Sequence, residues 1–408
     1  MKKLLPLMLI FTLLLTACGL DPKSNDPEVK NWELIKQSAE NTEVIMAVDH
    51  SNGEAIEWLR GTFSEYLKSE YQVTLKLVEQ SLTKTVAELT DEKRREVTNG
   101  QVDIILIENY GFKEAYENGI LYGPFADKLP NIKSTIGLNA LSYVAKEGID
   151  TGHYWVPYGR KQLTFIYNQD VFYETPENIE GLKLIMEENK GTITYPDPRK
   201  SEEGLAFVLS IIGESLDFEP YLSGNFNQAA FLTAIQPGMD QLMAMKPMLK
   251  DSGMVYPASL QALDDLFING GLSVSYTMDM NYVTDKLREY EYPEGASTFV
   301  IPSGVATFYE GAVIAYNSVN KSGAMVVLNA LLSPEMQASK CDPKGWGSLP
   351  VYEMDIVTEE ALTPFKSIKL KGTTVKALEY IEAAKPEFSP QMIAVILAEW
   401  ERRISAGE

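Results

Sequence analysis

Residues 102–131 read VDIILIENYGFKEAYENGILYGPFADKLPN, and the first six of them decide the fold class. The run from Val102 to Ile107 is almost continuously apolar and short. Such a run is typical of a strand that is buried on both faces of a parallel sheet. The polar and turn-forming residues 108–111 follow it directly, so the chain leaves the sheet there. The stretch therefore predicts an α/β fold.

The residues before this strand alternate strand and helix patterns. Short apolar or alternating runs at 43–48 (EVIMAV) and 73–78 (VTLKLV) predict two strands. Residues 83–99 predict a helix that is closed by Asn99-Gly100. An earlier helix is indicated by apolar residues at helical spacing: Ile56, Leu59, Phe63 and Leu67. This βαβαβ order predicts a parallel sheet whose ligand contacts lie at the carboxyl ends of its strands.

A second unit begins near residues 162–168 (QLTFIYN), which predict another strand. A helix over 205–212 is expected, with Ser201 as its N-cap and acidic residues in its first turn. Further strands are predicted at 191–195 and 271–276, and further helices at 324–332 and over most of 373–404. Residues 299–302 and 311–316 indicate that the chain crosses back. The chain thus predicts two α/β units with no internal repeat.

The N-terminus carries an export signal. Lys2 and Lys3 precede an apolar run from Leu4 to Leu15, and small residues lead to Cys18. These are the parts of a secretory signal, and a cysteine at the cleavage position makes it a bacterial lipoprotein signal. A transmembrane anchor fits less well, because the run is shorter than the roughly 20 residues that a bilayer span needs. We therefore predict a signal peptide over 1–17, a lipid on Cys18 and a polar tether over 18–30.

Composition excludes several classes of protein. The formal net charge is −21, and cleavage after residue 17 would remove two lysines and no acid, which gives −23. This charge repels nucleic acid and anionic lipid, so membrane attachment is expected to come from the lipid. Once Cys18 is lipidated, Cys341 has no partner for a disulfide within the chain, and we expect it to be an inert, partly buried thiol. Two histidines, His50 and His153, exclude a histidine-rich metal site.

Four segments carry a resemblance to a known family. They are VDIILIENYGFKEAYENGILYGPFADKLPN (102–131), PYGRKQLTFIYN (157–168), GTITYPDPRKSEEG (191–204) and NKSGAMVVLNALLSPEMQ (320–337). They resemble the family 1 solute-binding proteins of ABC importers. The sequences of the first and last segments are most similar to the YnjB-like branch. The segments are spread over most of the chain that follows the signal.

The resemblance implies an architecture and a function. It implies the two-lobed type II periplasmic-binding fold, with a mixed, mostly parallel sheet in each lobe and the ligand in a cleft between the lobes. It implies one lobe from residues 31–162 and 308–345, and the other from 163–307 and 346–408. The chain would cross between the lobes near 158–165 and 300–310, and again after a helix that ends near Lys340. A lipid-anchored monomer of this kind would deliver a small molecule to a permease and ATPase complex, without a cofactor and without catalysis.

Two loops of the first lobe are candidates for ligand contact. Asp49 and Asn52 follow the opening strand, where they either face the cleft or only build a turn. Glu108, Asn109 and Tyr110 follow the most apolar strand and offer charged, amide and aromatic groups. The alternative for Asn109 is a role in the turn before the next helix.

Two further candidates lie at the first crossing and at the start of the second lobe. Tyr158 and Arg160 either line the cleft or pack at the hinge, with Arg160 in an ion pair. Tyr195, Asp197 and Arg199 stand in a Pro-Asp-Pro-Arg loop before a helix, a loop that often faces the cleft in related binding proteins. The alternative is a structural turn, since Glu202 and Glu203 in the first helical turn oppose an anionic ligand.

The last candidates follow a strand or stand between glycines. Tyr276 and Asp279 come at the end of the predicted strand 271–276, and Trp346 lies between Gly345 and Gly347. Trp346 either stacks on an aromatic or cationic ligand or anchors the core. Together with Asp49 and Glu108, these residues favour a cationic or aromatic organic ligand that is thiamine-like or polyamine-like.

Other functions remain open from the sequence. A sugar is an alternative ligand, whereas ferric iron is disfavoured because the chain has no adjacent tyrosine pair of the kind that ferric-binding relatives use. A surface hydrolase or lyase with Glu108 and Asp279 as a carboxylate pair is an alternative from another class. A sensing lipoprotein that works without a transporter is a third.

Overall fold

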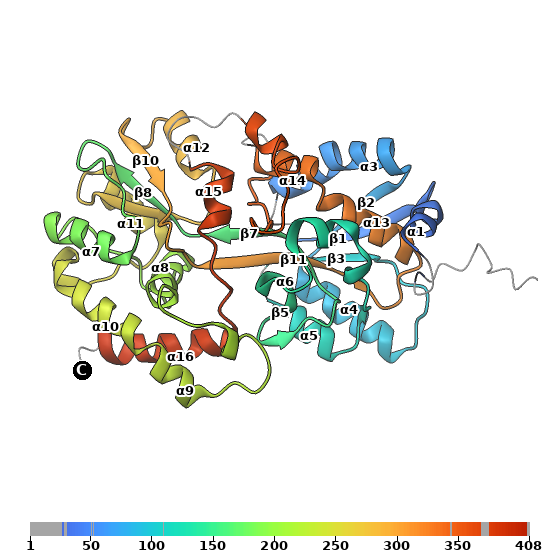
Figure 1. Cartoon of the computed structure of the whole chain (residues 1–408), viewed down its shortest axis with the longest axis horizontal. Helices are drawn as coiled ribbons and strands as arrows, with labels where there is room; N and C mark the ends of the chain where they lie inside the picture. Colours follow the sequence, from blue (N-terminus) through green and yellow to red (C-terminus); the bar gives the residue numbers. More distant parts are fainter. Residues whose placement is uncertain are drawn as a thin grey trace, which may run out of the picture.

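The computed structural model describes Pro27 and residues 31–49, 51, 53–108, 110–342, 345–368 and 375–405. The predicted signal peptide, Cys18 and nearly all of the tether lie outside these residues, as do Asn52 and Asn109. The described chain forms two lobes that lie side by side (Figure 1). The prediction of a two-lobed α/β fold is confirmed.

The first lobe contains a six-stranded sheet in the order β2-β1-β3-β11-β4, with β7 also paired to β11. Strands β1, β2 and β3 run parallel, as predicted, and β11 runs antiparallel to β3, β4 and β7. The strands are β1 (Glu43–Val48), β2 (Thr74–Glu79), β3 (Ile104–Ile107), β4 (Leu121–Tyr122), β7 (Val156–Gln162) and β11 (Thr307–Ala315).

Helices cover both faces of this sheet, which explains the uninterrupted apolar run of β3. Ile104 and Leu106 pack in one core cluster, and Ile105 and Ile107 pack in the cluster on the opposite face. A strand buried on both faces needs apolar residues at every position. The helices of this lobe are α1 (Trp32–Ala39), α2 (Gly53–Trp58), α3 (Ser64–Tyr71), α4 (Leu82–Arg94), α5 (Phe112–Glu117), α6 (Leu141–Val144), α13 (Lys321–Leu331) and α14 (Pro334–Cys341).

Two helices of the first lobe differ from their predicted extent. The helix expected over 83–99 ends at Arg94, because Glu96 takes a positive φ of 57° and the Val97 amide turns back to the Glu92 carbonyl at 3.0 Å. The helix expected over 56–67 is divided by a wider turn at Leu59–Phe63, where the Ser64 hydroxyl donates to the Leu59 carbonyl at 2.8 Å.

The second lobe has a smaller sheet with strand order β10-β8-β9. Its strands are β8 (Thr164–Asn168), β9 (Val274–Thr277) and β10 (Ala296–Phe299), and both pairings are antiparallel. Its helices are α7 (Ile179–Glu188), α8 (Glu202–Gly213), α9 (Gln228–Ala234), α10 (Gln236–Met245), α11 (Leu260–Ile268), α12 (Tyr282–Arg288), α15 (Ala377–Glu382) and α16 (Pro390–Trp400). Ser201 caps α8 as predicted and accepts from the Gly204 amide.

The expectation of a mostly parallel sheet in this lobe is wrong, and the predicted strand at 191–195 explains why. That segment bonds to Ser273, the residue before β9, but it forms no strand. Its carbonyls bond to separate partners. The Thr192 carbonyl accepts from the Ser273 amide at 2.7 Å, and the Ile193 carbonyl accepts from the Lys250 amide at 2.9 Å. Because no ladder forms there, only the antiparallel pairs remain. Residues 299–302, where the chain is expected to cross back, begin at the last residue of β10 (Ala296–Phe299).

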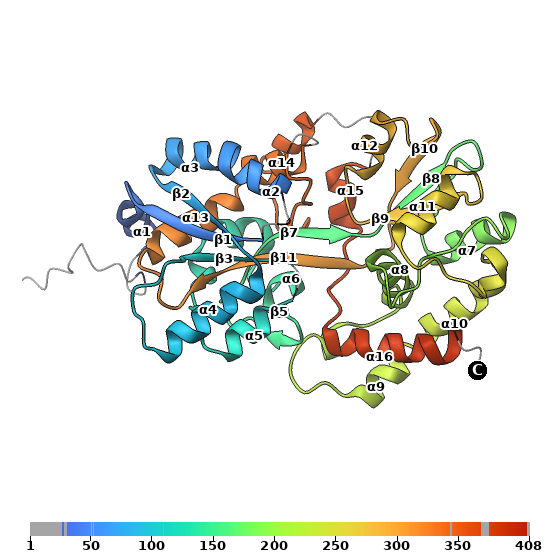
Figure 2. The same ribbon diagram turned by 180° about the vertical axis from the view of Figure 1, so that it is seen from behind.

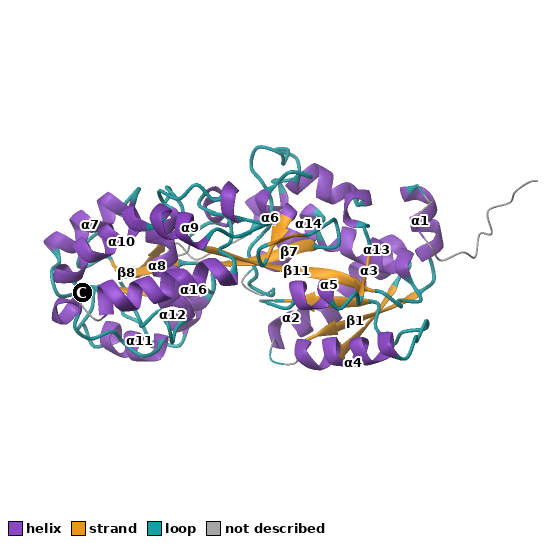
Figure 3. Cartoon of the chain, turned by 90° about the horizontal axis from the view of Figure 1, so that it is seen from below, coloured by secondary structure: helices purple, strands orange, loops and turns teal. Residues whose placement is uncertain are grey.

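Long strands join the lobes. β7 leads into β8, and β10 returns through residues 300–306 into β11, so that β7 and β11 span the space between the lobes (Figures 2 and 3). After α14 the chain passes through residues 345–349, which we call the cleft-floor segment, and continues to α15. Trp346 and Val351, which the predicted boundaries assign to the second lobe, pack in the core of the first. Within the described residues, none of the helices is both long and apolar enough to serve as a membrane span.

Candidate ligand-binding cleft

A cavity of about 350 Å³ lies where the two lobes meet the crossing strands. A volume of this size suits a small organic molecule. Its walls come from the loop and helix α2 after β1, the end of β3, the crossing strands β7 and β11, the end of β9 and the cleft-floor segment. The lining residues are Ser51, Gly53, Glu54, Glu108, Arg160, Lys161, Met278, Asp279, Glu310, Trp346, Gly347 and Ser348.

Carboxylates from opposite lobes face each other in this cavity. Burial raises the pKa of the Glu54 carboxyl, in the first lobe, and the charge of Asp279, in the second, raises it further. Burial likewise raises the pKa of Asp279, although the Asn281 amide donates to that carboxylate at 2.8 Å and Lys161 also opposes the shift. Both carboxylates are therefore poorly compensated, which is typical of a functional site.

The crossing strand β11 adds a third carboxylate, Glu310. It is 2 % exposed, although it stands within an otherwise apolar strand. The Ser348 hydroxyl donates to its Oε2 at 3.0 Å, and the Lys161 ammonium lies 4.0 Å from its Oε1. Glu310 thus reaches the cavity with one hydroxyl donor and one distant cation.

An aromatic wall closes one side of the cavity. Trp346 is 5 % exposed and packs against Tyr158, with ring centroids 5.2 Å apart, and against Trp58 at 6.0 Å. The buried Tyr158 hydroxyl has no hydrogen-bond partner among the described residues. Burial raises the pKa of Tyr158 well above its usual value, and the charges of Glu310 and Glu108 add to this.

The structure brings together four of the residues predicted from the sequence: Glu108, Arg160, Asp279 and Trp346. Arg160 is buried, and its Nε and Nη2 atoms have no hydrogen-bond partner among the described residues. Tyr158 lies behind Trp346. Asp49 accepts from the amide and hydroxyl of Ser51, at 2.9 and 2.7 Å, as expected of a turn residue.

Five other predicted residues lie away from this cavity. Tyr195 and Tyr276 pack in the core of the second lobe, where Tyr195 accepts from Trp400 Nε1 at 3.0 Å. Asp197 and Arg199 form a paired bridge of 2.9 and 2.7 Å, which lowers the pKa of Asp197. These contacts correspond to the structural alternatives for that loop. Tyr110 is 45 % exposed and lines a separate shallow pocket beside α5.

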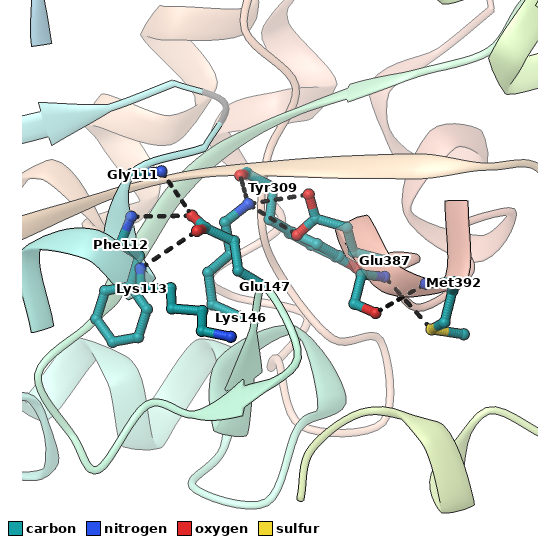
Figure 4. A network of polar contacts seen from close by, with 9 residues as sticks. Gly111, Phe112, Lys113, Lys146, Glu147, Tyr309, Glu387 and Met392 are labelled. Atoms are coloured by element: carbon teal, nitrogen blue, oxygen red, sulfur yellow. Dashed lines mark hydrogen bonds and ion pairs between the residues drawn. The ribbon is translucent and has the colours of Figure 1, made fainter. Parts of the chain in front are cut away.

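The Tyr110 loop adjoins a polar network that we call the hairpin brace, formed by Lys146 and Glu147 of the hairpin β5 (Ala145–Lys146) and β6 (Ile149–Asp150), together with Glu387 (Figure 4). The Glu147 carboxylate accepts from the first three amides of the α5 region, those of residues 111, 112 and 113, at 2.8, 2.9 and 3.2 Å. The Lys146 ammonium donates to both carboxylate oxygens of Glu387, at 2.9 and 2.8 Å, and to the Tyr309 carbonyl at 2.8 Å. The brace therefore connects α5, β11 and the segment before α16.

Several lining residues were missed from the sequence. Glu310 could have been selected from the sequence, because it is the one acid in the largely apolar run 307–315. A buried carboxylate in such a strand is costly unless it is paired or serves a function. Glu54 had none, because an acid in the first turn of a helix is ordinary. In the described part of the chain, no three side chains of His, Cys, Asp or Glu are placed to hold a metal ion.

Comparison with known proteins identifies the family. A sequence profile of bacterial extracellular solute-binding proteins matches residues 63–338, more than half of the chain. The chain belongs to this family. Solute-binding proteins of this kind act outside the cytoplasm and deliver their ligands to an ABC permease and ATPase complex.

A curated relative of this solute-binding protein is Protein YnjB of Escherichia coli (strain K12). The two are 26% identical over 337 residues, which cover 79% of this chain and 83% of the relative. The YnjB-like resemblance inferred from the four segments is therefore confirmed.

Solved structures share the fold at lower identity. The cyclic α-maltosyl-1,6-maltose binding protein of Arthrobacter globiformis has a TM-score of 0.65 and 17% identity, and the alignment covers 90% of this chain and 94% of that one. An ABC transporter protein of Clostridium perfringens has a TM-score of 0.58 and 18% identity, covering 88% and 99%. The spermidine/putrescine substrate-binding protein PotD of Streptococcus pneumoniae has a TM-score of 0.52 and 15% identity, covering 88% and 98%. One fold thus serves sugar and polyamine binders, so the fold does not define the ligand.

Proposed function

We propose that this solute-binding protein captures an organic cation, thiamine-like or polyamine-like, and delivers it to an ABC importer while a lipid on Cys18 holds it at the membrane. The observation that carries the proposal is the pair of carboxylates, Glu54 and Asp279, that opposite lobes direct into one cavity. Like charges at close range oppose lobe closure, and a cation between them turns repulsion into attraction.

The whole lining favours a positive ligand. Four carboxylates, Glu54, Glu108, Asp279 and Glu310, outnumber two basic side chains, Arg160 and Lys161. Trp346 adds an aromatic surface, which suits an ammonium group or a ring that carries positive charge. Affinity would then come from closure of the cleft and not from chemistry on the ligand.

The proposal of a lipid anchor rests on the sequence. Lys2, Lys3 and the apolar run to Leu15 form the export signal, and residues 19–30 give a tether of roughly 40 Å when extended. Mass spectrometry of the membrane fraction tests this directly. We expect a lipid-modified N-terminal cysteine in the natural protein and none in Cys18→Ser, which should leave the membrane.

A thermal-shift screen of residues 19–408 tests the ligand class. A ligand present at 100 times its Kd adds about 2.7 kcal/mol to the stability of the folded state. We expect thiamine-like compounds or polyamines to shift the transition, while dicarboxylates, phosphate and sugars do not. Shifts only with anions or sugars would contradict the proposal.

Matched variants then locate the binding site. Asp279→Asn and Glu54→Gln each remove one carboxylate from the cavity, and we expect each to weaken the binding of the cation found in the screen at least tenfold. Glu57→Gln is the control, because Glu57 lies on the same helix as Glu54 but does not line the cavity. Equal losses in all three variants would indicate long-range charge only and would contradict direct contact.

A further inference from the structure

A buried lysine lies beneath the cavity. Lys340, near the end of α14, has no exposed surface. Its ammonium donates to the Tyr158 carbonyl on β7 and, in the cleft-floor segment, to the Ser348 hydroxyl at 3.3 Å and the Leu349 carbonyl at 3.2 Å. One side chain therefore fastens the cleft-floor segment to a crossing strand.

The contacts of Lys340 extend to two groups of the cavity wall. Ser348, which accepts from Lys340, donates to Glu310 at 3.0 Å and so connects the ammonium to the carboxylate on β11. The ammonium also lies 5.8 Å from the ring centroids of Trp346 and Tyr158. Among the described residues, no carboxylate lies within ion-pair distance of it.

Such an arrangement is costly for folding. An ammonium taken out of water without a direct counter-charge destabilises the folded state, and an apolar side chain would fill the same space at lower cost. Burial lowers the pKa of Lys340 to about 8; Arg160 acts in the same direction, and Cys341 and Glu310 oppose it. All of its bonds go to β7 and the cleft-floor segment, two segments that supply side chains to the cavity wall, so this costly group is better explained by the cavity than by the core.

We propose that Lys340 is a positioning residue of the binding cleft, which fixes the cleft-floor segment against β7 and thereby sets the Trp346 ring and, through Ser348, the Glu310 carboxylate. Its importance for recognition rests on the proposed function, whereas its geometric role does not. The tests below therefore use the ligand-free protein, so that failure of the cation screen and failure of this proposal are separate results.

The first test follows tryptophan fluorescence of residues 19–408 from pH 6 to 10. Because the ammonium lies beside Trp346, we expect a step with a midpoint near 8 in the unmodified protein. The step should be absent from Trp346→Phe, which assigns the signal, and absent from Lys340→Met, which removes the titrating group. Absence of a Trp346-dependent step from the unmodified protein would overturn the proposal, and this outcome does not depend on whether any Lys340 variant folds.

The second test measures hydrogen exchange of the cleft-floor segment. The Gly347 amide bonds to the Lys340 carbonyl at 2.9 Å, and the Leu349 amide bonds to the Arg160 carbonyl at 3.3 Å, so both report on its attachment. In Lys340→Met we expect these amides to exchange at least tenfold faster, with β1 and α16 unchanged. Ser348→Ala is the matched control, because it removes the connection to Glu310 and leaves two of the three ammonium bonds in place. In this variant the Gly347 and Leu349 amides should exchange at close to the rate in the natural protein. Unchanged exchange in Lys340→Met, or equal acceleration in both lobes, would overturn the proposal.

Discussion

The positive charges of two buried lysines of this protein are compensated in different ways. Lys146, in the hairpin brace, donates directly to both oxygens of the Glu387 carboxylate. Lys340, beneath the cleft, donates to two carbonyls and a hydroxyl and reaches Glu310 only through Ser348. The Lys146 ammonium thus has a direct counter-charge, whereas no carboxylate of the described residues lies within ion-pair distance of the Lys340 ammonium.

This difference separates structure from recognition. A buried ion pair with good geometry fixes one arrangement of the chain, and removal of either partner leaves an uncompensated charge. Burial raises the pKa of Glu387 in the brace as well, but there the bonded Lys146 opposes the shift directly. Around the cleft, burial raises the pKa of Glu54 and Asp279 and lowers that of Lys340, and none of these three groups has a directly bonded counter-charge among the described residues. Perturbed groups gather where a ligand is expected to complete the electrostatics.

The largest effect is expected in the brace. Lys146→Met leaves the Glu387 carboxylate, only 12 % exposed, without its cation, so the free energy of unfolding should fall by about 3–5 kcal/mol. Chemical denaturation followed by circular dichroism measures this. Lys36→Met is the control, because the Lys36–Glu33 pair is exposed and worth at most about 1 kcal/mol. Equal losses of stability in the two variants would contradict a structural role for the buried Lys146–Glu387 pair.

The next effect is a pH dependence that belongs to Lys340. Its pKa is about 8 in the folded protein against 10.5 for an ordinary lysine, so the unfolded chain binds more protons between these values. Stability contributed by Lys340 therefore rises with pH in this window, by about 3 kcal/mol in total. The measurement is the free energy of unfolding of the natural protein minus that of Lys340→Met at pH 7.5 and at pH 10.5. A difference that stays constant or falls with pH would contradict the account.

Two glycines with nearly the same positive φ lie in the two regions and allow a direct comparison. Gly347 (φ +79°) lies in the cleft floor and Gly148 (φ +82°) lies beside the brace. A Cβ on Gly347 would come within 2.9 Å of Asn281 Nδ2, whereas on Gly148 its nearest neighbour is Ser389 Cβ at 3.4 Å. We expect Gly148→Ala to cost about 1 kcal/mol and Gly347→Ala about 2 kcal/mol. Thermal denaturation shows which variant loses more stability. A larger loss in Gly148→Ala than in Gly347→Ala would show that the cleft floor is less tightly packed than the region beside the brace.

The smallest effect concerns Cys341, next to Lys340. Burial raises the pKa of its thiol to about 12, and its Sγ donates to the Ser348 carbonyl at 3.3 Å. At pH 7.5 we expect no reaction of the folded protein with a disulfide reagent within an hour and complete reaction in denaturant. Rapid labelling of the folded chain would show that the region beneath the cleft opens readily.

The fold was largely predictable from the sequence because burial on two faces leaves a clear pattern. The run at β3 needs apolar side chains at all positions, and the structure places it at the centre of the first sheet. The segment 191–195 (GTITY) also contains strand-favouring residues but forms no ladder, since its partners are isolated amides from two distant segments. Whether a segment pairs as a strand depends on where the tertiary fold places it, and the local sequence pattern does not predict that placement.

The candidate site was predictable only in part, for a related reason. Glu108 and Asp279 follow strand ends, and Trp346 lies between glycines, so simple rules select them, and the structure places all three at one cavity. Tyr195 and Tyr276 were selected by the same rules but turn into the core. Glu310 lies in the interior of a strand, and its position at the cavity depends on β11 crossing between the lobes.

The most direct test of the central claim is closure of the cleft on a cation, measured by small-angle X-ray scattering of residues 19–408. The radius of gyration is compared without ligand and with saturating spermidine, putrescine, thiamine, citrate or maltose. We expect contraction with at least one of the three cations and none with citrate or maltose. Contraction with citrate or maltose, or no contraction with any of the three cations, would contradict the central claim.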